Sequence, residues 1–576
     1  MLDTCNRIKA ALGESRPLFL GAFWFGLFIN VLMLAVPLYS LQVLDRVLSS
    51  GSTDTLLMLS LITAILLLFM GLLQGFRALV FSHIGRWLDD RLSMDLVRKS
   101  AVVAVQRPNI GTQPIRDLAT IKRFVISPAM SSAFDAPWAV IYFVVIFMIH
   151  VDLGIAVVLG ACILLVVALL AERMPAKLSA AANDEQIKSM QALDSVIRNA
   201  EVVRSMGLLD NAAARWQRHN QKALGSGFSA SNINTVITHS TRTLRMGLQV
   251  LLTGLGGYYV LAGEMSAGGI IAVSILSGKA LAPFDAAVSI YQSWIGVKKA
   301  YGRLVDLDQA VPDHWETTRL PEPQGSLSVE KLTYQDKTSG HWILRGINFS
   351  AHPGEAIGII GPSGAGKTTL ARLLVGVLNP TSGAARLDGA ALHQWDHEQL
   401  GGLIGYLPQG VELFSGTIAE NIARLDQEAE DDAVIEAAKT AVVHEAILQL
   451  PSGYQTDIGT NGALLSAGQR QRIGLARCFY GGPKLVVLDE PNANLDSEGE
   501  LALSQCLVNA KRQGITTVTI AHRPSVLQNV DKILVLQHGE AKLFGPTEEV
   551  MAQLATGGNK VQPLRPPART EAGHGE

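Results

Sequence analysis

The sequence predicts a protein of two parts: a polytopic α-helical membrane domain followed by an α/β nucleotide-binding domain of the P-loop type. The 576 residues are 48% hydrophobic and only 17% charged, whereas soluble domains carry about 25% charged residues. The first half holds six long apolar runs, and the second half holds a phosphate-binding loop. We expect a membrane domain at residues 1–305, a linker at 306–326, a nucleotide-binding domain at 327–555 and a disordered tail at 556–576.

Each of the six apolar runs has at least the roughly 17 residues that a membrane-spanning helix needs. Two long segments between them, 77–132 and 173–245, are charged, helix-prone and rich in Lys and Arg. The positive-inside rule therefore places both segments and both termini in the cytoplasm. The first run is long enough to remain as an anchor, so we expect no cleavable signal peptide. The predicted spans are residues 18–41, 56–76, 133–149, 153–171, 246–262 and 268–295.

One lysine, Lys279, interrupts the sixth run. A charge near the bilayer centre costs about 2.5 to 3.5 kcal/mol on insertion scales, so the position predicts a side chain that faces a pore. Asp285 cannot share its face of the helix, because six steps rotate about 240°. The alternative is a shifted sixth helix with Lys279 reaching the interface.

Net charge and cysteine spacing exclude two other classes of site. The formal net charge is −2 and the basic residues are dispersed, so no nucleic-acid partner is expected. The four cysteines show no metal-ligand spacing and are expected to be reduced structural thiols. They are Cys5, Cys162, Cys478 and Cys506.

The phosphate-binding loop fills every position of the pattern G-x-x-x-x-G-K-[ST]. A buried strand is predicted before it and a helix after it, so backbone N–H groups at a helix N-terminus would face the phosphates of ATP. Lys367 would add a positive charge and Thr368 a hydroxyl ligand for Mg²⁺. The alternative is a Gly-rich surface turn. The residues predicted to bind nucleotide here are Gly361, Pro362, Ser363, Gly364, Ala365, Gly366, Lys367, Thr368 and Thr369.

Two carboxylates follow an apolar run at 485–488. Asp489 is placed to hold Mg²⁺, as the acidic residue of this strand does in P-loop NTPases. Glu490, directly after it, is placed to accept a proton from an attacking water. An acidic strand end that faces solvent is the alternative.

The segment between these motifs resembles the signature of ATP-binding-cassette (ABC) transporters. Ser466, Ala467, Gly468 and Gln469 match the LSGGQ pattern, with Ala467 in place of its first glycine. A serine hydroxyl and a glycine backbone at a helix N-terminus would form a second anion site that closes over a γ-phosphate. By itself this stretch would also suit an ordinary capped surface helix.

The resemblance implies roles for three further motifs. Gln409 matches the Q-loop glutamine, which contacts Mg²⁺ and the attacking water. The residues 494–496 resemble the D-loop, which crosses to the partner subunit, and His522 matches the switch histidine that touches the γ-phosphate. Lys367, Gln409, Glu490 and His522 are therefore the expected catalytic residues, with Thr368, Gln409 and Asp489 around the metal.

The residue that stacks on adenine is less clearly marked. The position that usually holds a tyrosine in the family is Asp336 here, and either Tyr334 or Trp342 could replace it; we favour Tyr334.

The resemblance also implies an assembly. Two cassettes pair head to tail, with each ATP between the phosphate loop of one and the signature of the other. This chain has one cassette, hence a homodimer with the type I exporter fold and six transmembrane helices. Residues 113–118 and 206–209 fall where such exporters place their coupling helices, and ordinary helical corners are the alternative.

Two stretches narrow the resemblance to the permease/ATPase of type I secretion systems, the group that exports proteases, lipases and haemophores. They are D-E-P-N-A-N-L-D at 489–496 and F-D-A-P-W at 134–138. The resemblance implies export of an unfolded protein with a C-terminal signal from the bacterial inner membrane, through a periplasmic adaptor and an outer-membrane channel. The short stretch before the first run leads us to expect no leader peptidase domain.

Three alternatives remain to be weighed. A lipid or drug flippase would have the same cassette and spans. An ATP-responsive membrane regulator that does not pump would tolerate loss of Glu490 or Ser466, and both are present. A soluble ABC ATPase of repair or translation is excluded by the six apolar runs.

Overall fold

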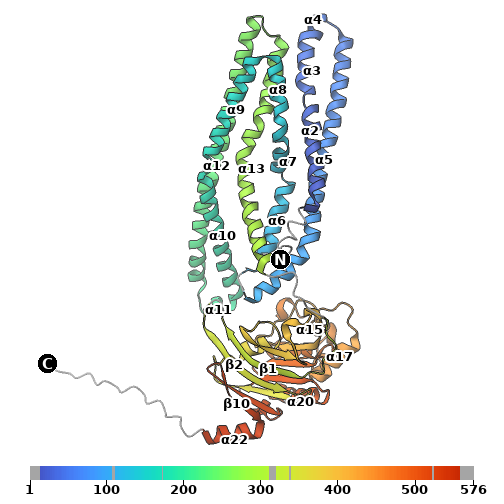
Figure 1. Cartoon of the computed structure of the whole chain (residues 1–576), viewed down its shortest axis with the longest axis vertical. Coiled ribbons are helices and arrows are strands. Elements are labelled where there is room, and N and C mark those ends of the chain that lie inside the picture. The colour runs from blue at the N-terminus through green and yellow to red at the C-terminus, as the bar shows by residue number, and fades with distance from the viewer. Residues whose placement is uncertain are drawn as a thin grey trace, which may run out of the picture. The chain divides into compact units, whose positions relative to one another are not determined.

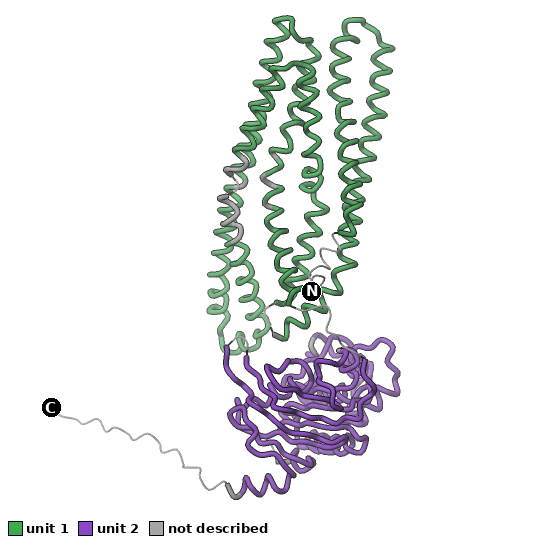
Figure 2. Tube along the Cα trace, in the orientation of Figure 1, with its two compact units in different colours: residues 1–313 green, residues 314–576 purple. Residues whose placement is uncertain are grey.

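The computed structural model describes residues 13–106, 110–171, 173–310, 319–336, 339–521 and 524–557. The chain divides into two compact units, residues 1–313 and 314–576 (Figure 2). Helix α13 continues to Ala310, so the first residues of the predicted linker, 306–310, are helical. Helix α22 ends at Gly557, within two residues of the predicted start of the tail.

The described part of the first unit is helical throughout (Figure 1). Its helices are α2 (Arg16–Leu32), α3 (Ala35–Gln42), η1 (Val43–Val47), α4 (Leu48–Ser50), α5 (Thr53–Gln106), α6 (Gln113–Ile126), α7 (Pro128–Asp135), η3 (Ala136–Ala139), α8 (Val140–Ile149), α9 (Val151–Ala171), α10 (Arg173–Arg198), α11 (Ala200–Ser205), α12 (Leu209–Leu261) and α13 (Ala267–Ala310).

Two of these helices are much longer than a bilayer is thick. Helix α5 has 54 residues and therefore extends roughly 80 Å, against a hydrocarbon core of about 30 Å. The predicted second span and the start of the first charged segment are thus one continuous helix. Helix α12, with 53 residues, joins the second charged segment to the predicted fifth span in the same way.

The predicted first span is broken rather than continuous. Helix α2 ends at Leu32 and α3 begins at Ala35. Pro37 has no N–H with which to bond the carbonyl of Met33, four residues earlier, and its ring crowds that carbonyl. The regular helix is therefore interrupted at Met33 and Leu34, just before this proline.

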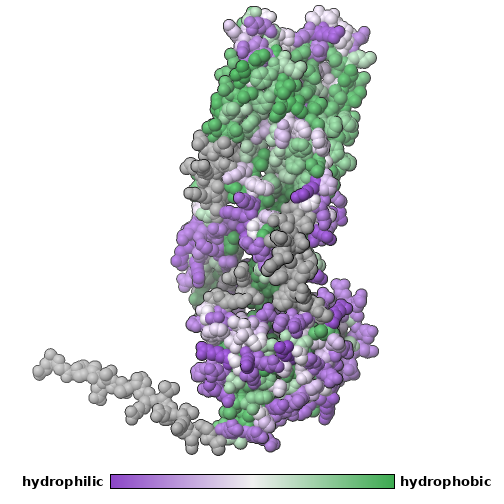
Figure 3. Space-filling model, in the orientation of Figure 1, coloured by the Kyte–Doolittle hydropathy of each residue, from purple (hydrophilic) through white to green (hydrophobic). Residues whose placement is uncertain are grey.

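Four helical stretches are long and apolar enough to cross a membrane: Arg16–Ser50, Thr53–Val105, Pro128–Ile149 and Ala267–Phe284. Val151–Val167 is a shorter apolar helix. The predicted fifth span, at the end of α12, is not among them. Six crossings therefore stay a prediction. Figure 3 shows an apolar band on the helical unit with polar residues at its tips.

The second unit combines two sheets with surrounding helices (Figure 1). Its strands are β1 (Leu327–Gln335), β2 (Trp342–Ala351), β3 (Ala356–Ile360), β4 (Ser382–Leu387), β5 (Ala390–Ala391), β6 (Ile404–Leu407), β7 (Leu485–Asp489), β8 (Thr516–Ile520), β9 (Lys532–Gln537) and β10 (Glu540–Pro546). Its α-helices are α14 (Lys367–Leu374), α15 (His397–Leu403), α16 (Ile418–Ile422), α17 (Asp431–Thr440), α18 (His444–Leu448), α19 (Ala467–Phe479), α20 (Ser497–Arg512), α21 (Pro524–Leu527) and α22 (Thr547–Gly557). Short 3₁₀ turns are η4 (Leu392–Gln394), η5 (Gly453–Gln455) and η6 (Thr460–Gly462).

The larger sheet positions the predicted site. Its strand order is β10-β9-β3-β8-β7-β6, and β3, β6, β7, β8 and β9 run parallel. Every residue of β7 and β8 is buried, as expected for central strands of a parallel sheet that is covered on both faces. Ligands of parallel sheets bind at the carboxyl ends of the strands. The phosphate loop, Gln409 and Asp489 follow or end β3, β6 and β7, so they meet at that edge.

Candidate nucleotide-binding site

The phosphate loop connects β3 to α14 and requires glycine at two positions for different reasons. A Cβ on Gly361 would collide with the carbonyl oxygen of Leu536 on the neighbouring strand β9. Gly366 has a φ of 97°, and a Cβ there would lie 2.8 Å from the side chain of Leu344. Larger residues would distort the loop that has to wrap the phosphates. Between these glycines, Pro362, Ser363 and Gly364 are exposed.

Lys367 opens helix α14 and lies over the loop. Its Nζ donates hydrogen bonds to the carbonyl oxygens of Gly361 at 2.8 Å and Pro362 at 2.9 Å. Burial lowers the pKa of Lys367, and the nearby charges of Glu490 and Asp489 oppose that shift. An ammonium that donates to carbonyl oxygens can exchange these bonds for stronger, charge-assisted bonds to a phosphate group.

Asp489 ends β7 and is fully buried. Neither of its carboxylate oxygens has a hydrogen-bond donor in the described part of the chain. Burial raises its pKa, while Thr368 lies close enough to oppose the shift without completing a hydrogen bond. A buried carboxylate left without donors, beside a hydroxyl, is an oxygen donor set that suits Mg²⁺. Asp489 and Thr368 therefore fit the predicted metal.

Glu490 is held in an unusual backbone conformation beside Gln409. Its φ of 52° lies in the left-handed region, which costs energy for a residue with a side chain. Its N–H donates to the carbonyl oxygen of Ile520 at 3.0 Å. Gln409 Nε2 donates to Glu490 Oε2 at 3.1 Å. The structure thus brings Lys367, Asp489, Glu490 and Gln409 together.

The signature residues form a capped helix N-terminus. Ser466 Oγ accepts from the N–H of Gln469 at 3.2 Å, and the N–H of Ser466 donates to Gln469 Oε1 at 2.8 Å. This capping box begins α19, and Ser466, Ala467 and Gln469 are exposed. Among the described residues, no hydrogen bond or ion pair joins residues 466–469 to the phosphate loop. Within one chain, the two predicted halves of the ATP site are separate.

A pocket of about 480 Å³ opens beside the signature. Ser466, Gly468 and Gln469 line it together with Asn494 and Asp496 of the predicted D-loop. The D-loop and the signature therefore share one open surface.

Two residues that sequence reasoning missed hold this surface together. Gln471 is buried, and its Nε2 donates to the carbonyl oxygen of Pro491 at 3.0 Å. Arg472 Nη2 donates to Asp496 Oδ1 at 2.9 Å. Both bonds tie the signature helix to the segment that follows Glu490. The sequence does place both residues in the first helical turn after Gln469, and this position could have identified them.

The two candidates for adenine stacking lie on one hairpin. Tyr334 pairs with Leu344, the neighbour of Gly366, and it is half-buried against the core. Trp342 pairs with Gln335 and is 47% exposed. Asp336, at the usual family position, instead accepts a hydrogen bond from the Ser339 hydroxyl at 2.6 Å and so shapes the turn. Stacking by Tyr334 stays a prediction.

His522 lies outside the described residues. Ala521, directly before it, donates to the carbonyl oxygen of Ile359 at 3.3 Å, on the strand that leads into the phosphate loop. The role of His522 therefore stays a prediction.

Comparisons with known proteins cover both units. Residues 19–281 match the family described as ABC transporter transmembrane region, and residues 344–493 match the ABC transporter family. A type I secretion system ATP-binding protein, PrsD, of Rhizobium meliloti is 38% identical over 95% of this chain and 94% of its own. A leukotoxin translocation ATP-binding protein, LktB, of Mannheimia haemolytica is 30% identical over 94% of this chain and 77% of its own.

Among solved structures, a bacterial Atm1-family ABC exporter with ATP bound matches with a TM-score of 0.80 at 22% identity, covering 94% of this chain and 96% of that one. This likeness shows the ABC exporter fold. Taken with the relatives above, it confirms the predicted fold class. The chain belongs to the ABC transporters, within the family of type I secretion ATP-binding proteins.

Proposed function

We propose that this protein uses ATP hydrolysis to export an unfolded polypeptide, as the permease and ATPase of a type I secretion system. The observation that carries the proposal is the cluster of Lys367, Asp489, Glu490 and Gln409, in a chain related along 95% of its length to a type I secretion ATP-binding protein. The protein is a multi-pass protein of the bacterial inner membrane with a cytoplasmic ATPase domain.

We propose a part in hydrolysis for each residue of the cluster. The phosphate loop and Lys367 bind the phosphates and stabilise the negative charge that grows in the transition state. Asp489 and Thr368 would hold Mg²⁺, which neutralises phosphate charge when it is bound. Glu490, oriented by Gln409, accepts a proton from the attacking water.

We further propose that two copies of the chain form the working unit. Ser466 and Gln469 are exposed at a helix N-terminus and make no bond to the phosphate loop of their own chain within the described residues. A helix N-terminus favours an anion. The signature would therefore bind the γ-phosphate held by a partner's phosphate loop in a symmetric homodimer.

The export route would continue beyond this protein. A periplasmic adaptor and an outer-membrane channel would complete the path, and the cargo would carry a C-terminal secretion signal. A lipid or drug exporter would share the cassette, but the similarity to two secretion proteins along most of the chain favours a polypeptide cargo. A regulator without pumping would not need the assembled base Glu490.

The test compares proteins in the medium of cells that carry either the natural chain or the variant Glu490→Gln. We expect one or a few proteins to disappear from the medium and to accumulate in the cells. An unchanged medium at equal amounts of transporter would refute the proposal. A change confined to lipid composition would instead support the flippase.

A further inference from the structure

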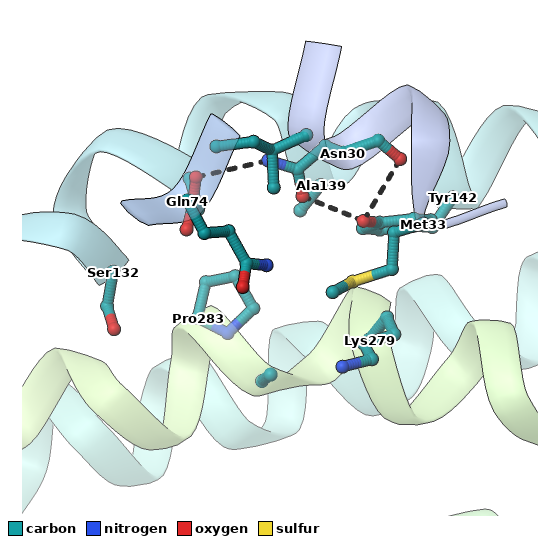
Figure 4. Close-up of a pocket in the computed structure, with 11 residues that line it drawn as sticks. Asn30, Met33, Gln74, Ser132, Ala139, Tyr142, Lys279 and Pro283 are labelled. Carbon is teal, nitrogen blue, oxygen red and sulfur yellow. Dashed lines mark hydrogen bonds between the residues drawn. The ribbon is translucent and has the colours of Figure 1, made fainter. Parts of the chain in front are cut away.

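The helical unit contains a small polar cavity inside its predicted spans (Figure 4). Its volume is about 170 Å³. Helices α2, α5, α7, α8 and α13 contribute to its walls. The polar lining residues are Asn30, Gln74, Ser132, Asp135, Tyr142 and Lys279.

One wall of the cavity is a hydrogen-bonded network without excess charge. Arg77, 6% exposed, donates from Nη1 to Asp135 Oδ1 at 2.5 Å and from Nη2 to Asp135 Oδ2 at 3.1 Å. Asn30 Nδ2 donates to Asp135 Oδ1 at 3.1 Å, and the Tyr142 hydroxyl donates to Asn30 Oδ1 at 2.7 Å. The bidentate pair neutralises the charge of Asp135. The side-chain amide of Asn30 already uses both N–H groups and its oxygen in hydrogen bonds.

The opposite wall carries a charge that nothing in the described chain balances. Figure 4 shows Lys279 on α13, across the cavity from Asn30 and Tyr142, with the Gln74 amide nearby. Among the described residues, neither Lys279 nor Gln74 has a hydrogen-bond or ion-pair partner. The cavity therefore has a net positive charge and free donors inside a membrane span. Because Lys279 lines a polar cavity, its side chain has an alternative to snorkelling, as the pore prediction requires.

We propose that this cavity binds the carboxylate of an acidic side chain of the polypeptide in transit, with Lys279 as the ion-pair partner and Gln74 as an amide donor. This inference rests on the proposed export function and names a site within it. A charged group inside a membrane is costly unless it is paired or hydrated, so a passing carboxylate would be stabilised there. Asp135 does not repel it, because Arg77 already neutralises that charge.

The size of the cavity selects a side chain over a larger ligand. Pockets for drug-sized molecules measure about 300 to 1,000 Å³, whereas this one measures about 170 Å³. An aspartate or glutamate side chain fits that space.

The test uses the full-length protein in lipid nanodiscs and two synthetic unstructured peptides. The peptides differ only in that glutamates in the first are glutamines in the second. We expect the acidic peptide to bind about tenfold more tightly than the amide peptide, the order of effect for a charge-assisted contact. Lys279→Met should remove the preference, and Lys279→Arg should retain it. Lys298→Met, on the same helix outside the span, is the matched control.

A second readout locates the contact. A water-soluble carbodiimide couples a carboxylate to an amine that touches it, and mass spectrometry should map the attached acidic peptide to Lys279. Equal binding of both peptides, a preference that survives Lys279→Met, or coupling elsewhere only, would each overturn the proposal. Basal ATP hydrolysis should persist in all variants. The outcome is therefore separate from the Glu490→Gln comparison, which tests export itself.

Discussion

Asp489 and Glu490 are neighbours in sequence but lie in different surroundings. Asp489 is fully buried without a hydrogen-bond donor among the described residues, whereas Glu490 receives the Gln409 amide. Environments that differ in this way give two carboxylates two roles. The first suits a metal ion and the second a proton from water.

If Glu490 is the general base, its replacement should slow ATP hydrolysis without weakening ATP binding. In Glu490→Gln, phosphate release should fall about 10²- to 10⁴-fold, the usual contribution of a general base, while ATP affinity stays within a factor of about two. Glu498→Gln, an exposed change on α20, is the control. A variant that hydrolyses ATP at the natural rate would exclude Glu490 as the base.

The role of Asp489 predicts a pH dependence of metal binding. Burial raises the pKa of this carboxyl, and only its deprotonated form binds Mg²⁺. The Asp489 carboxylate therefore takes up its proton at a higher pH than an ordinary aspartate does. The Mg²⁺-dependent part of nucleotide affinity, measured by titration calorimetry with a non-hydrolysable analogue, should weaken over that range. Asp489→Asn should abolish this part at every pH. A pH-independent Mg²⁺ affinity would contradict the assignment.

The two aromatic residues of the β1–β2 hairpin give opposite predictions. Stacking of a base on an aromatic ring is worth about 1 to 3 kcal/mol. Tyr334→Ala should therefore weaken ATP binding by about 5- to 150-fold, and Tyr334→Phe should bind normally. Trp342→Ala, exposed on the neighbouring strand, serves as the comparison. If Trp342→Ala shows the loss instead, Trp342 is the stacking residue.

At the scale of elements, ion pairs fasten the cytoplasmic helices of the first unit to α13. Arg303 donates from Nε and Nη2 to Asp117 on α6 at 2.8 and 2.6 Å. Lys99 on α5 pairs with Asp308 at 2.5 Å, and both side chains are buried. Helix α6 includes the predicted coupling segment 113–118, so α13 and that segment are joined by a bidentate pair.

Breaking that pair should destabilise the helical unit. Arg303→Gln leaves Asp117, 2% exposed, without its charged donor, at a cost of about 1.5 to 3 kcal/mol for a hydrogen bond to a charged group. The melting temperature in a fixed detergent should drop measurably. Arg86→Gln removes an exposed pair with Asp90 at 3.9 Å and should change it little. Equal effects of the two changes would argue against the Asp117–Arg303 contact.

The helices also show where sequence reasoning reaches its limit. Apolar runs marked the spans, but hydropathy does not reveal that α5 continues unbroken from the second span to Gln106. The break before α3 follows from Pro37, which lay inside the apolar run unremarked. In the second unit, the strand, the phosphate loop and the helix follow one another directly in the sequence. Local motifs are therefore sufficient to identify the loop and Asp489.

At the scale of the whole molecule, contacts between distant segments were the part that the sequence did not reveal. Arg77, Asp135 and Asn30 lie up to 105 residues apart and meet only because their helices pack together. No spacing rule predicts that meeting, and for Lys279 the sequence offers only the energetic cost of a charge inside the bilayer. The same limit applies to Ser466, whose predicted ligand lies on another copy of the chain.

The central claim, that two copies share each ATP site and that hydrolysis there drives export, is tested by mixing two inactive variants. Lys367→Met disables the phosphate loop. Ser466→Asp retains a helix-capping residue but places a negative charge against the γ-phosphate. Each variant alone should release none of the cargo identified from the medium comparison. Expressed together, half of the dimers are mixed and each mixed dimer has one complete site of two, so cargo release should recover to about a quarter of the natural rate. No recovery, with both variants folded and present in equal amounts, or full activity of either variant alone, would contradict the account.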